Sequence, residues 1–261
     1  MNLVIGISLG LIVSLAGYLA RLLTFKGAIA AGFVGGMIFA LGGLNPAILL
    51  ISFFVSSSAL SKVGHSRKLA LATSFEKGSQ RDMGQVLANG SLAAGLSLLL
   101  ALTEMDIWML GIAGALAAVT ADTWSTELGV LARRKPRLIT SGVQVEPGTS
   151  GGITLEGTIA SILGAYLIGL ISALLLGQQN VALVVTLAGT SGAIVDSFLG
   201  ASVQAMYYCT NCEKATEHHP HHSCGNATTH TKGCHWMSND LVNFISSIVG
   251  AMVSMLIWRV L

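Results

Sequence analysis

Charged residues are scarce in this chain. Only 10% of the 261 residues are Asp, Glu, Lys or Arg, while 52% are hydrophobic, whereas a soluble domain carries about 25% charged residues. This composition, with a mean hydropathy of +0.72, excludes an ordinary soluble domain and indicates an integral membrane protein. Proline is rare at 4 residues and glycine abundant at 31, a balance typical of closely packed transmembrane helices.

We also expect no cleavable signal sequence, because the N-terminus has neither a basic segment nor a small-residue cleavage motif. We therefore expect the segment that begins at Leu3 to be the first membrane span. The apolar stretches are continuous rather than alternating with polar residues, which excludes a transmembrane β-barrel.

Hydropathy predicts an all-α, polytopic transmembrane helix bundle of about eight spans, forming one transmembrane domain over residues 1–261. The third and fifth spans have only about 15 residues, below the usual range of about 17–25. Because Asn45–Pro46 alone separates the second span from the third, a re-entrant pair is an alternative there. The predicted spans are Leu3–Leu19, Gly27–Leu44, Pro46–Leu60, Gln85–Leu102, Ile107–Ala121, Ile153–Leu176, Val181–Leu199 and Leu241–Trp258.

The basic residues lie almost entirely in four alternate connections. These connections hold 13 of the 14 basic residues, and only Arg259 lies on the other side. The positive-inside rule makes the side that holds these four connections cytoplasmic and places both termini outside. Ten of the twelve acidic residues lie on the same side, with Glu104 and Asp106 as the exceptions. One membrane face therefore collects acids, bases and hydroxyls, as expected of a site at the membrane–water boundary.

The stretch RDMGQVLANG, Arg81–Gly90, enters the fourth span. Asp82 and Asn89 are seven residues apart and share a helix face. An ordinary helix start explains Asp82, since an acid there favours the helix dipole. It does not explain Asn89, which lies deeper.

The stretch TADTWSTELG, Thr120–Gly129, follows an apolar run, and its two carboxylates, Asp122 and Glu127, bracket the hydroxyls of Thr123, Ser125 and Thr126. On a continuous helix Asp122 and Glu127 would point roughly 140° apart. They share a cation only if the helix breaks near Gly129; otherwise each has a different role. The alternative is a hydrated helix end, although carboxylates at membrane depth are costly and usually functional.

The stretch VEPGTSGGITLEG, Val145–Gly157, runs into the sixth span. Its glycines allow the backbone to approach a ligand closely, and it ends at a helix N-terminus, which favours anions. It is not a Walker A motif, and an ordinary turn is the alternative. The nearby RRKPR run, Arg133–Arg137, can neutralise phosphate as well as anchor the topology. Glu156 is a weaker candidate, because the favourable interaction of an acidic residue with the helix dipole is enough to explain its place at a helix start.

The stretches GAIVDSFLGA and SNDLVN belong to the last two spans. Asp196 lies within the seventh span, near its cytoplasmic end, and no helix end explains it. Asp240 opens the eighth span, with Asn243 one turn further on. Asp196 is therefore the charge whose position most strongly indicates function.

All four cysteines and all but one of the seven histidines lie between Cys209 and Trp236. We expect residues 205–238 to form a cytoplasmic Cys/His-rich loop between the last two spans, where reducing conditions disfavour disulfides. The spacing favours a structural zinc ion, and the candidate ligands are Cys209, Cys212, Cys224 and Cys234, with His222 as an alternative fourth. The other interpretations are a metal-scavenging loop or free thiols. The distinct composition of the loop predicts a stabilising insert rather than catalytic machinery.

Five motifs together resemble an integral membrane family that contains the chloroplast phytyl-phosphate kinases and the transmembrane protein 19-like proteins. They occur in family order from Gln85 to Phe244 and are QVLANG, ADTWSTELG, PGTSGGITLEG, VDSFLGA and NDLVNF. The chain is more distantly similar to dolichol kinases and CDP-diacylglycerol synthases, which use CTP and a divalent cation on lipids. The resemblance implies phosphoryl transfer from a nucleoside triphosphate such as CTP to a prenyl monophosphate such as phytyl or geranylgeranyl phosphate.

The motifs fit this chemistry, because phosphoryl transfer depends on positioning and charge neutralisation, and Mg²⁺ takes oxygen ligands. The candidate catalytic residues are Asp122, Glu127, Asp196 and Asp240, of which Asp122 and Asp196 are the expected Mg²⁺ ligands. The candidate substrate- and nucleotide-binding residues are Arg81, Asp82, Asn89, Ser125, Thr126, Arg133, Arg134, Lys135, Arg137, Gly148, Thr149, Ser150, Gly151, Gly152, Glu156 and Asn243.

Three other functions are alternatives. A cytidylyltransferase that makes a CDP-lipid would use the same kind of metal–triphosphate site. A transporter or flippase of an anionic lipid would need polar residues through the full membrane depth, whereas the outer face here has few. A zinc-loop interaction protein leaves Asp196 and the glycine loop unexplained. We expect a nucleotide and a membrane lipid as partners and no nucleic acid; the sequence leaves the oligomeric state open.

Overall fold

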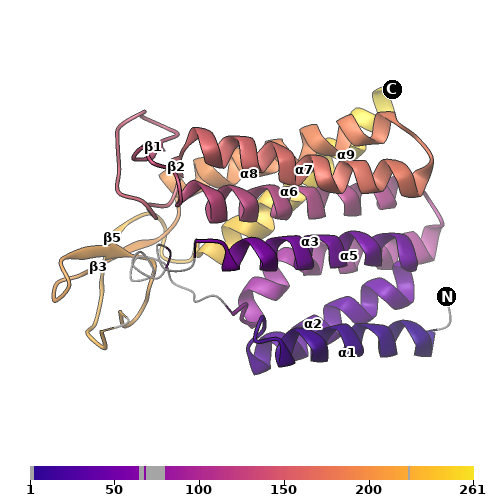
Figure 1. Ribbon diagram of the computed structural model, residues 1–261, viewed down its shortest axis with the longest axis horizontal. Helices are drawn as coiled ribbons and strands as arrows, with labels where there is room; N and C mark the ends of the chain where they lie inside the picture. The colour runs from indigo at the N-terminus through magenta and orange to yellow at the C-terminus, as the bar shows by residue number, and fades with distance from the viewer. Residues whose placement is uncertain (1–2, 65–67, 69–79, 223) are drawn as a thin grey trace.

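The computed structural model describes residues 3–64, 68, 80–222 and 224–261. In these ranges eight α-helices and one short π-helix form a bundle along the long axis of the molecule (Figure 1). Seven segments are long and apolar enough to cross a membrane, and α1 is a shorter apolar helix. The predicted all-α membrane bundle is therefore confirmed. Its elements are α1 (Leu3–Leu19), α2 (Phe25–Met37), η1 (Ile38–Gly42), α3 (Leu44–Lys62), α5 (Met83–Thr103), α6 (Ile107–Gly129), α7 (Leu155–Leu176), α8 (Asn180–Ser202) and α9 (Asn239–Val260).

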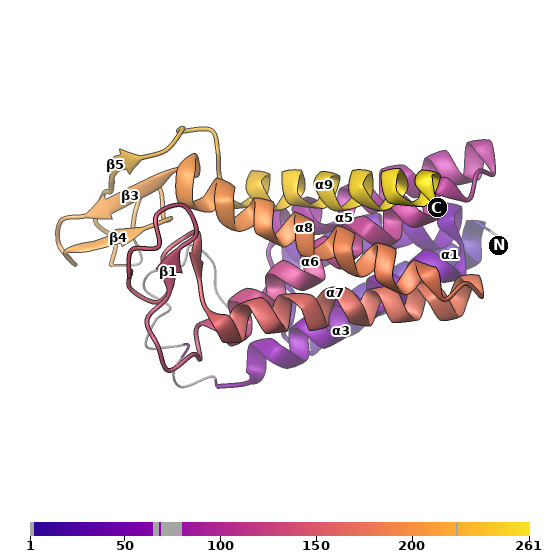
Figure 2. The ribbon, with the colours of Figure 1, turned by 90° about the horizontal axis from the view of Figure 1, so that it is seen from above.

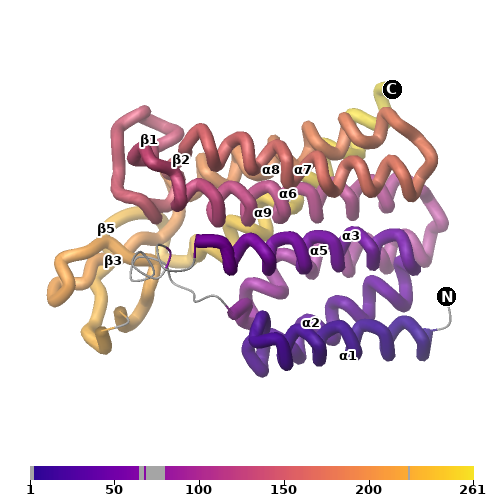
Figure 3. Tube along the Cα trace, in the orientation of Figure 1, coloured from indigo at the N-terminus to yellow at the C-terminus, as the bar shows by residue number. Residues whose placement is uncertain are grey.

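Two small antiparallel sheets lie together at one end of the bundle. Strand β1 (Arg137–Leu138) pairs with β2 (Gly152–Ile153), and β3 (Met206–Cys209) lies between β4 (Lys214–Thr216) and β5 (Thr229–Lys232). Figures 1 and 2 show both chain termini at the opposite end, and the trace in Figure 3 shows the connections after α6 and α8 gathered at the strand-bearing end. That this end is cytoplasmic stays a prediction. Arg67 and Lys77, which contribute to the basic asymmetry, lie outside the described residues.

The break between the second and third spans falls at Gly43 rather than at the predicted Asn45–Pro46. Gly43 has a φ of +79°, a value that favours glycine. Pro46 lies in the first turn of α3, where its missing N–H has no helical partner to lose. Each of the two flanking segments is long enough to be a separate span.

The predicted end of the fifth span at Ala121 was wrong, because α6 continues for eight residues to Gly129. The hydroxyls that suggested a helix end bond within the helix instead. Thr120 Oγ1 donates to the carbonyl of Leu116 at 2.6 Å, and Thr123 Oγ1 donates to that of Val119 at 2.7 Å. Such back-bonding satisfies a hydroxyl without ending the helix. Asp122 and Glu127 therefore both belong to α6.

Helix α6 is the centre of the bundle, with every residue from Met109 to Ala121 buried. It packs closely against α8 because the facing residues are small. A Cβ placed on Gly192 of α8 would lie 2.5 Å from Cβ of Ala118 on α6. Asp196 and Asp122 each follow one of these two residues by four positions, so they lie on the same faces of their helices. Small-residue packing thus brings the two carboxylates together.

We predict that Gly192→Ala destabilises the bundle. The added methyl group meets Ala118 and, at 2.9 Å, the backbone oxygen of Ser246, and overpacking typically costs about 1–3 kcal/mol. The matched control is Gly95→Ala in α5, where a Cβ meets nothing within 4 Å and helix propensity favours alanine by about 1 kcal/mol. Thermal unfolding of the purified proteins in detergent should show a lower Tm for Gly192→Ala alone. Equal Tm values would contradict the close α6–α8 contact.

Candidate active site

A cleft of about 380 Å³ lies at the strand-bearing end of the bundle. Its walls come from α3, α5, α6 and α8, from the loop before α7, from the start of α9 and from the Cys/His-rich segment. Helices α5, α7 and α9 begin at this end, so their partly positive ends lie on the side where an anion would bind.

Asp122 of α6 and Asp196 of α8 both line the cleft, with their carboxyl groups within hydrogen-bonding distance of each other. Asp196 is only 9% exposed, and its Oδ2 accepts no hydrogen bond from the described residues. Asp122 is half-buried, and two carboxylates in contact at such a place repel each other unless a proton or a cation lies between them. The orphaned oxygen and the paired carboxylates therefore fit an oxygen-ligated cation such as Mg²⁺.

Glu127 has different partners, as the continuous helix requires. Its Oε1 accepts a hydrogen bond from Ser61 Oγ at 2.5 Å, and its Oε2 pairs with Lys68 Nζ at 2.6 Å. Lys68 also donates to the backbone oxygen of Leu60 at 2.7 Å. Glu127 thus holds an ammonium group at the cleft wall, while Asp122 faces Asp196.

Arg81 contributes the second cation of the cleft wall, and its Nη1 donates to Ser58 Oγ at 2.6 Å. Burial lowers the pKa of Arg81 to about 10, against the opposing effect of the Glu127 charge, so the guanidinium stays protonated at neutral pH. Asn89, on the same side, has a buried Oδ1 that accepts no hydrogen bond from the described residues. Its amide is therefore available to a ligand.

The glycine loop, Gly148–Gly152, forms another wall of the cleft. Ser150 Oγ donates to Gln204 Oε1 at 2.8 Å, and Gln204 Nε2 donates to Glu217 Oε1 at 2.7 Å. Gly151 has a φ of +77°, which disfavours any residue with a side chain, and it lies directly on Ala201 of α8, where a side chain would collide. The loop is therefore held against α8 and the Cys/His-rich segment.

The cleft has a surplus of negative charge. Among its described lining residues the cations are Lys68 and Arg81, and the carboxylates are Asp122, Glu127, Asp196 and Glu217. When all are ionised, the carboxylates exceed the cations by two charges. A phosphate ligand would therefore need added divalent cations to bind here.

The structure brings many of the predicted site residues to the cleft, but not all. The predicted residues in the lining are Arg81, Asn89, Asp122, Ser125, Thr126, Glu127, Gly148, Thr149, Ser150, Gly151, Gly152, Asp196 and Asn243. Asp82 instead caps α5 in a capping box with Gln85, as an ordinary helix start does. Glu156 is exposed in the first turn of α7, and Asp240 is not part of the described lining.

The basic side chains of Arg133–Arg137 lie outside the described lining, although Pro136 of the same run is part of it, so their predicted role beside the phosphates needs correction. Lys135 pairs with exposed Glu146 at 2.5 Å, and Arg137 Nη1 donates to the backbone oxygen of Gly142 at 2.7 Å. Arg133 and Arg134 are exposed. Their side chains are solvated because the β1–β2 hairpin turns this segment outward.

The lining also contains residues that the sequence did not single out. Among these are Ser61, Lys68, Glu217 and Asn239. Lys68 and Glu217 belong to polar connections where a charge needs no special explanation, so no local pattern singled them out. Asn239 was available from the sequence, because it begins α9 four residues before Asn243 and shares its helix face.

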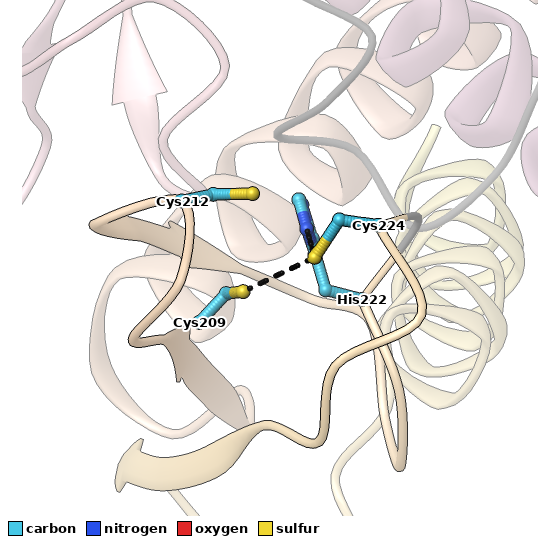
Figure 4. Close-up of side chains that lie close together, drawn as sticks. All are labelled: Cys209, Cys212, His222 and Cys224. Carbon is cyan, nitrogen blue, oxygen red and sulfur yellow. Dashed lines mark hydrogen bonds between the residues drawn. The ribbon is translucent and has the colours of Figure 1, made fainter.

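The Cys/His-rich segment forms a compact group of ligand atoms around β3 (Figure 4). The donor atoms of Cys209, Cys212, His222 and Cys224 all lie within 4.8 Å of one another. Sγ of Cys209 and Sγ of Cys224 are 3.6 Å apart, and His222 Nδ1 lies 3.3 Å from Sγ of Cys224. Four nitrogen and sulfur donors at these separations fit one tetrahedral metal ion. His222 completes the group in place of Cys234, which is exposed and outside it.

The thiols of this group have unlike acidities. The backbone N–H of Asn226, followed by the side chains of His222 and Asn226, lowers the pKa of Cys224 to about 5. Hydrogen bonding to Cys224, followed by desolvation, raises the pKa of Cys212 to about 11. A thiolate is thus favoured at Cys224, and thiolate is the form that binds metal.

The same segment also reaches the cleft, which changes its expected role. Glu217 follows β4 directly and lines the cleft, and its bond to Gln204 connects it to the glycine loop. The segment therefore contributes to the cleft wall and is more than the separate stabilising insert that its composition predicted.

Comparison with known proteins places this architecture among integral membrane proteins. A family model described as integral membrane protein DUF92 matches residues 8–251. An uncharacterised membrane protein of Methanocaldococcus jannaschii is 34% identical over 239 residues, which cover 92% of this chain and 87% of that protein. Protein PGR of Arabidopsis thaliana is 30% identical over 274 residues, covering 95% and 93%. The chloroplastic protein VTE6 of the same plant is 26% identical over 243 residues, covering 90% and 65%. No solved structure matches.

We predict that Cys209→Ser removes a bound metal and lowers the Tm of the purified protein, because metal binding and local folding are coupled. Cys234→Ser is the matched control, since Cys234 lies outside the ligand group. Elemental analysis and thermal unfolding measure both effects. The assignment fails if the parent protein holds no metal, or if the two variants lose metal equally.

Proposed function

The chain belongs to the DUF92 family of integral membrane proteins, and from this premise we propose that it is a prenyl-phosphate kinase. It transfers a phosphoryl group from a nucleoside triphosphate to a prenyl monophosphate, and CTP is the first candidate for the nucleotide. The resemblance of its motifs to the phytyl-phosphate kinases supports this proposal, as does the presence of a chloroplast protein among its relatives.

The observation that carries the proposal is the composition of one cleft. A carboxylate pair, a glycine loop and two buried or half-buried cations meet there, at the polar end of apolar helices. Phosphoryl transfer needs just such positioning and charge neutralisation, and little covalent catalysis. A lipid phosphate reaches this position with its tail still among the helices.

Each part of the cleft has a role in this reaction. Asp122 and Asp196 would hold Mg²⁺, which when bound neutralises charge on the phosphates. Arg81 and Lys68 contact phosphate oxygens, and Glu127 keeps Lys68 in position. The glycine loop lets the triphosphate approach the backbone closely, because no side chain intervenes at Gly148, Gly151 and Gly152.

The reaction itself needs no catalytic base. An oxygen of the prenyl monophosphate, already ionised at neutral pH, attacks the γ-phosphorus of the nucleotide. The new P–O bond forms as the bond from the γ-phosphorus to the β–γ bridging oxygen breaks. The products are the prenyl diphosphate and the nucleoside diphosphate. The carboxylates of the cleft are thus assigned to cation binding rather than to proton transfer.

We further propose that the cleft faces the cytoplasm, where nucleotides are available, and that the metal of the Cys/His group is zinc. The 13-to-1 distribution of basic residues supports the orientation. Three thiols and one imidazole whose donor atoms lie within 4.8 Å of one another support zinc over Mg²⁺, which prefers oxygen.

The proposal is tested by incubating the purified protein with Mg²⁺, CTP or ATP, and geranylgeranyl or phytyl monophosphate. Mass spectrometry should detect prenyl diphosphate and nucleoside diphosphate. A CDP-lipid with pyrophosphate would instead identify a cytidylyltransferase, which the same cleft would suit. Phosphate-lipid movement across vesicles without any chemical product would favour a transporter.

We predict that Asp122→Asn and Asp196→Asn each lower Mg²⁺-dependent turnover by roughly 10²-fold or more, the usual cost of losing an electrostatic contact to the transition state. Asn keeps the volume and removes the charge, so both proteins should remain folded. Asp106→Asn is the matched control, because Asp106 is exposed at the opposite end of α6. Turnover at the parent rate in both cleft variants would refute the cation-site assignment.

A further inference from the structure

A second cavity, about 70 Å³ in volume, lies between α1, α2, α3 and α5. Its walls are almost entirely apolar and include Val34, Phe39, Leu50 and Ile51. The function proposed for the polar cleft does not by itself require this cavity. Its place in the fold is informative, however, because it shares residues with that cleft.

Three residues line both the apolar cavity and the polar cleft, namely Arg81, Gln85 and Asn89. The two spaces therefore adjoin at the start of α5. An amphiphile whose charged group lies in the cleft therefore meets an adjoining apolar space at this junction. Because Asn89 also has an unsatisfied amide oxygen, the junction has hydrogen-bonding capacity for a ligand.

Arg81 is held firmly at the junction. Its backbone N–H donates to the oxygen of Leu22 at 3.0 Å, and its carbonyl accepts from the N–H of Thr24, also at 3.0 Å. Its guanidinium lies over the rings of Phe53 and Phe54, 5.6 and 5.2 Å from their centroids. Cation–π contacts of this kind keep a charge in place beside an apolar wall. One side chain thus combines a phosphate-binding cation with an aromatic floor.

We propose that this cavity is the binding site for the first part of the hydrocarbon tail of the lipid substrate, next to its phosphate. The inference rests on the proposed function and adds the route of the tail, between α1–α2 and α3–α5. An engineered apolar cavity of about 150 Å³ holds a benzene molecule, so a cavity of about 70 Å³ holds only the start of a prenyl chain. The remainder lies in the bilayer, beside the exposed apolar residues Leu11 and Phe33.

The cavity acts by shape and position rather than by hydrophobic affinity. A tail that leaves the bilayer for an apolar pocket gains little transfer free energy, because lipid is as apolar as the pocket wall. The pocket instead fixes the first isoprene unit so that the attached phosphate lies beside Arg81. Pre-positioning of this kind lowers the barrier of a bimolecular step.

The test uses geranylgeranyl monophosphate with a photoreactive diazirine in its first isoprene unit. After irradiation of the purified protein in detergent, peptide mapping should find the label within 50–54 of α3 or 86–90 of α5. Unlabelled geranylgeranyl monophosphate should compete with it. Label confined to other helices would overturn the proposal.

A matched pair of variants sharpens the test. Ala31→Phe places a ring in the cavity and should reduce labelling to background, because Ala31 lines the cavity wall. Ala16→Phe adds the same ring to an exposed position of α1 outside the lining and should leave labelling unchanged. Should Ala31→Phe fail to fold, the position of the label on the parent protein still tests the tail site.

The two proposals fail separately. If the label maps to the cavity but no prenyl diphosphate forms under any nucleotide, the tail site stands and the kinase assignment falls. If the diphosphate forms while the label lies elsewhere, the kinase stands and the tail site falls. Equal labelling in folded Ala31→Phe and Ala16→Phe would also refute the tail site.

Discussion

The close packing of α6 against α8 is the constraint on which the site depends. Gly192 lies directly on Ala118, and the same helix faces carry Asp196 and Asp122 one turn further on. With no bulky residue to separate the helices, the two carboxyl groups come into contact in a mostly buried place. Such an arrangement is unfavourable unless a proton or cation is shared. The helix packing therefore produces a pair of carboxylates that a shared proton or cation would stabilise.

The surroundings of this carboxylate pair are organised by one buried polar side chain. Gln204 is 1% exposed, accepts a hydrogen bond from Ser150 of the glycine loop and donates one to Glu217. A buried amide needs partners for both its groups, and here the partners belong to two different segments. The loop that would face the phosphates and the segment that holds the metal-ligand group are consequently fixed to each other. A structural change at this ligand group should therefore also alter the wall of the cleft.

Arg81 defines the boundary between the polar and apolar parts of the molecule. It adjoins both cavities, stacks on Phe53 and Phe54, and keeps its charge at neutral pH despite burial. A membrane lipid with a phosphate head has the same division within one molecule. The proposed kinase and the proposed tail site follow from this match, with the head directed to the nucleotide and the tail to the bilayer.

The sequence by itself determined the membrane class and the helical bundle, and it singled out Asp122, Asp196 and the glycine loop as candidates, because hydropathy and the cost of a charge at membrane depth are local properties. It misjudged the end of α6, since back-bonded threonines look like a helix terminus in hydropathy alone. Only the tertiary structure decided which polar residues meet. It left the basic side chains of Arg133–Arg137 exposed beside the β1–β2 hairpin, placed His222 rather than Cys234 in the ligand group and brought Lys68 and Glu217 to the cleft. Those choices depend on contacts between segments far apart in the chain, which no local pattern records.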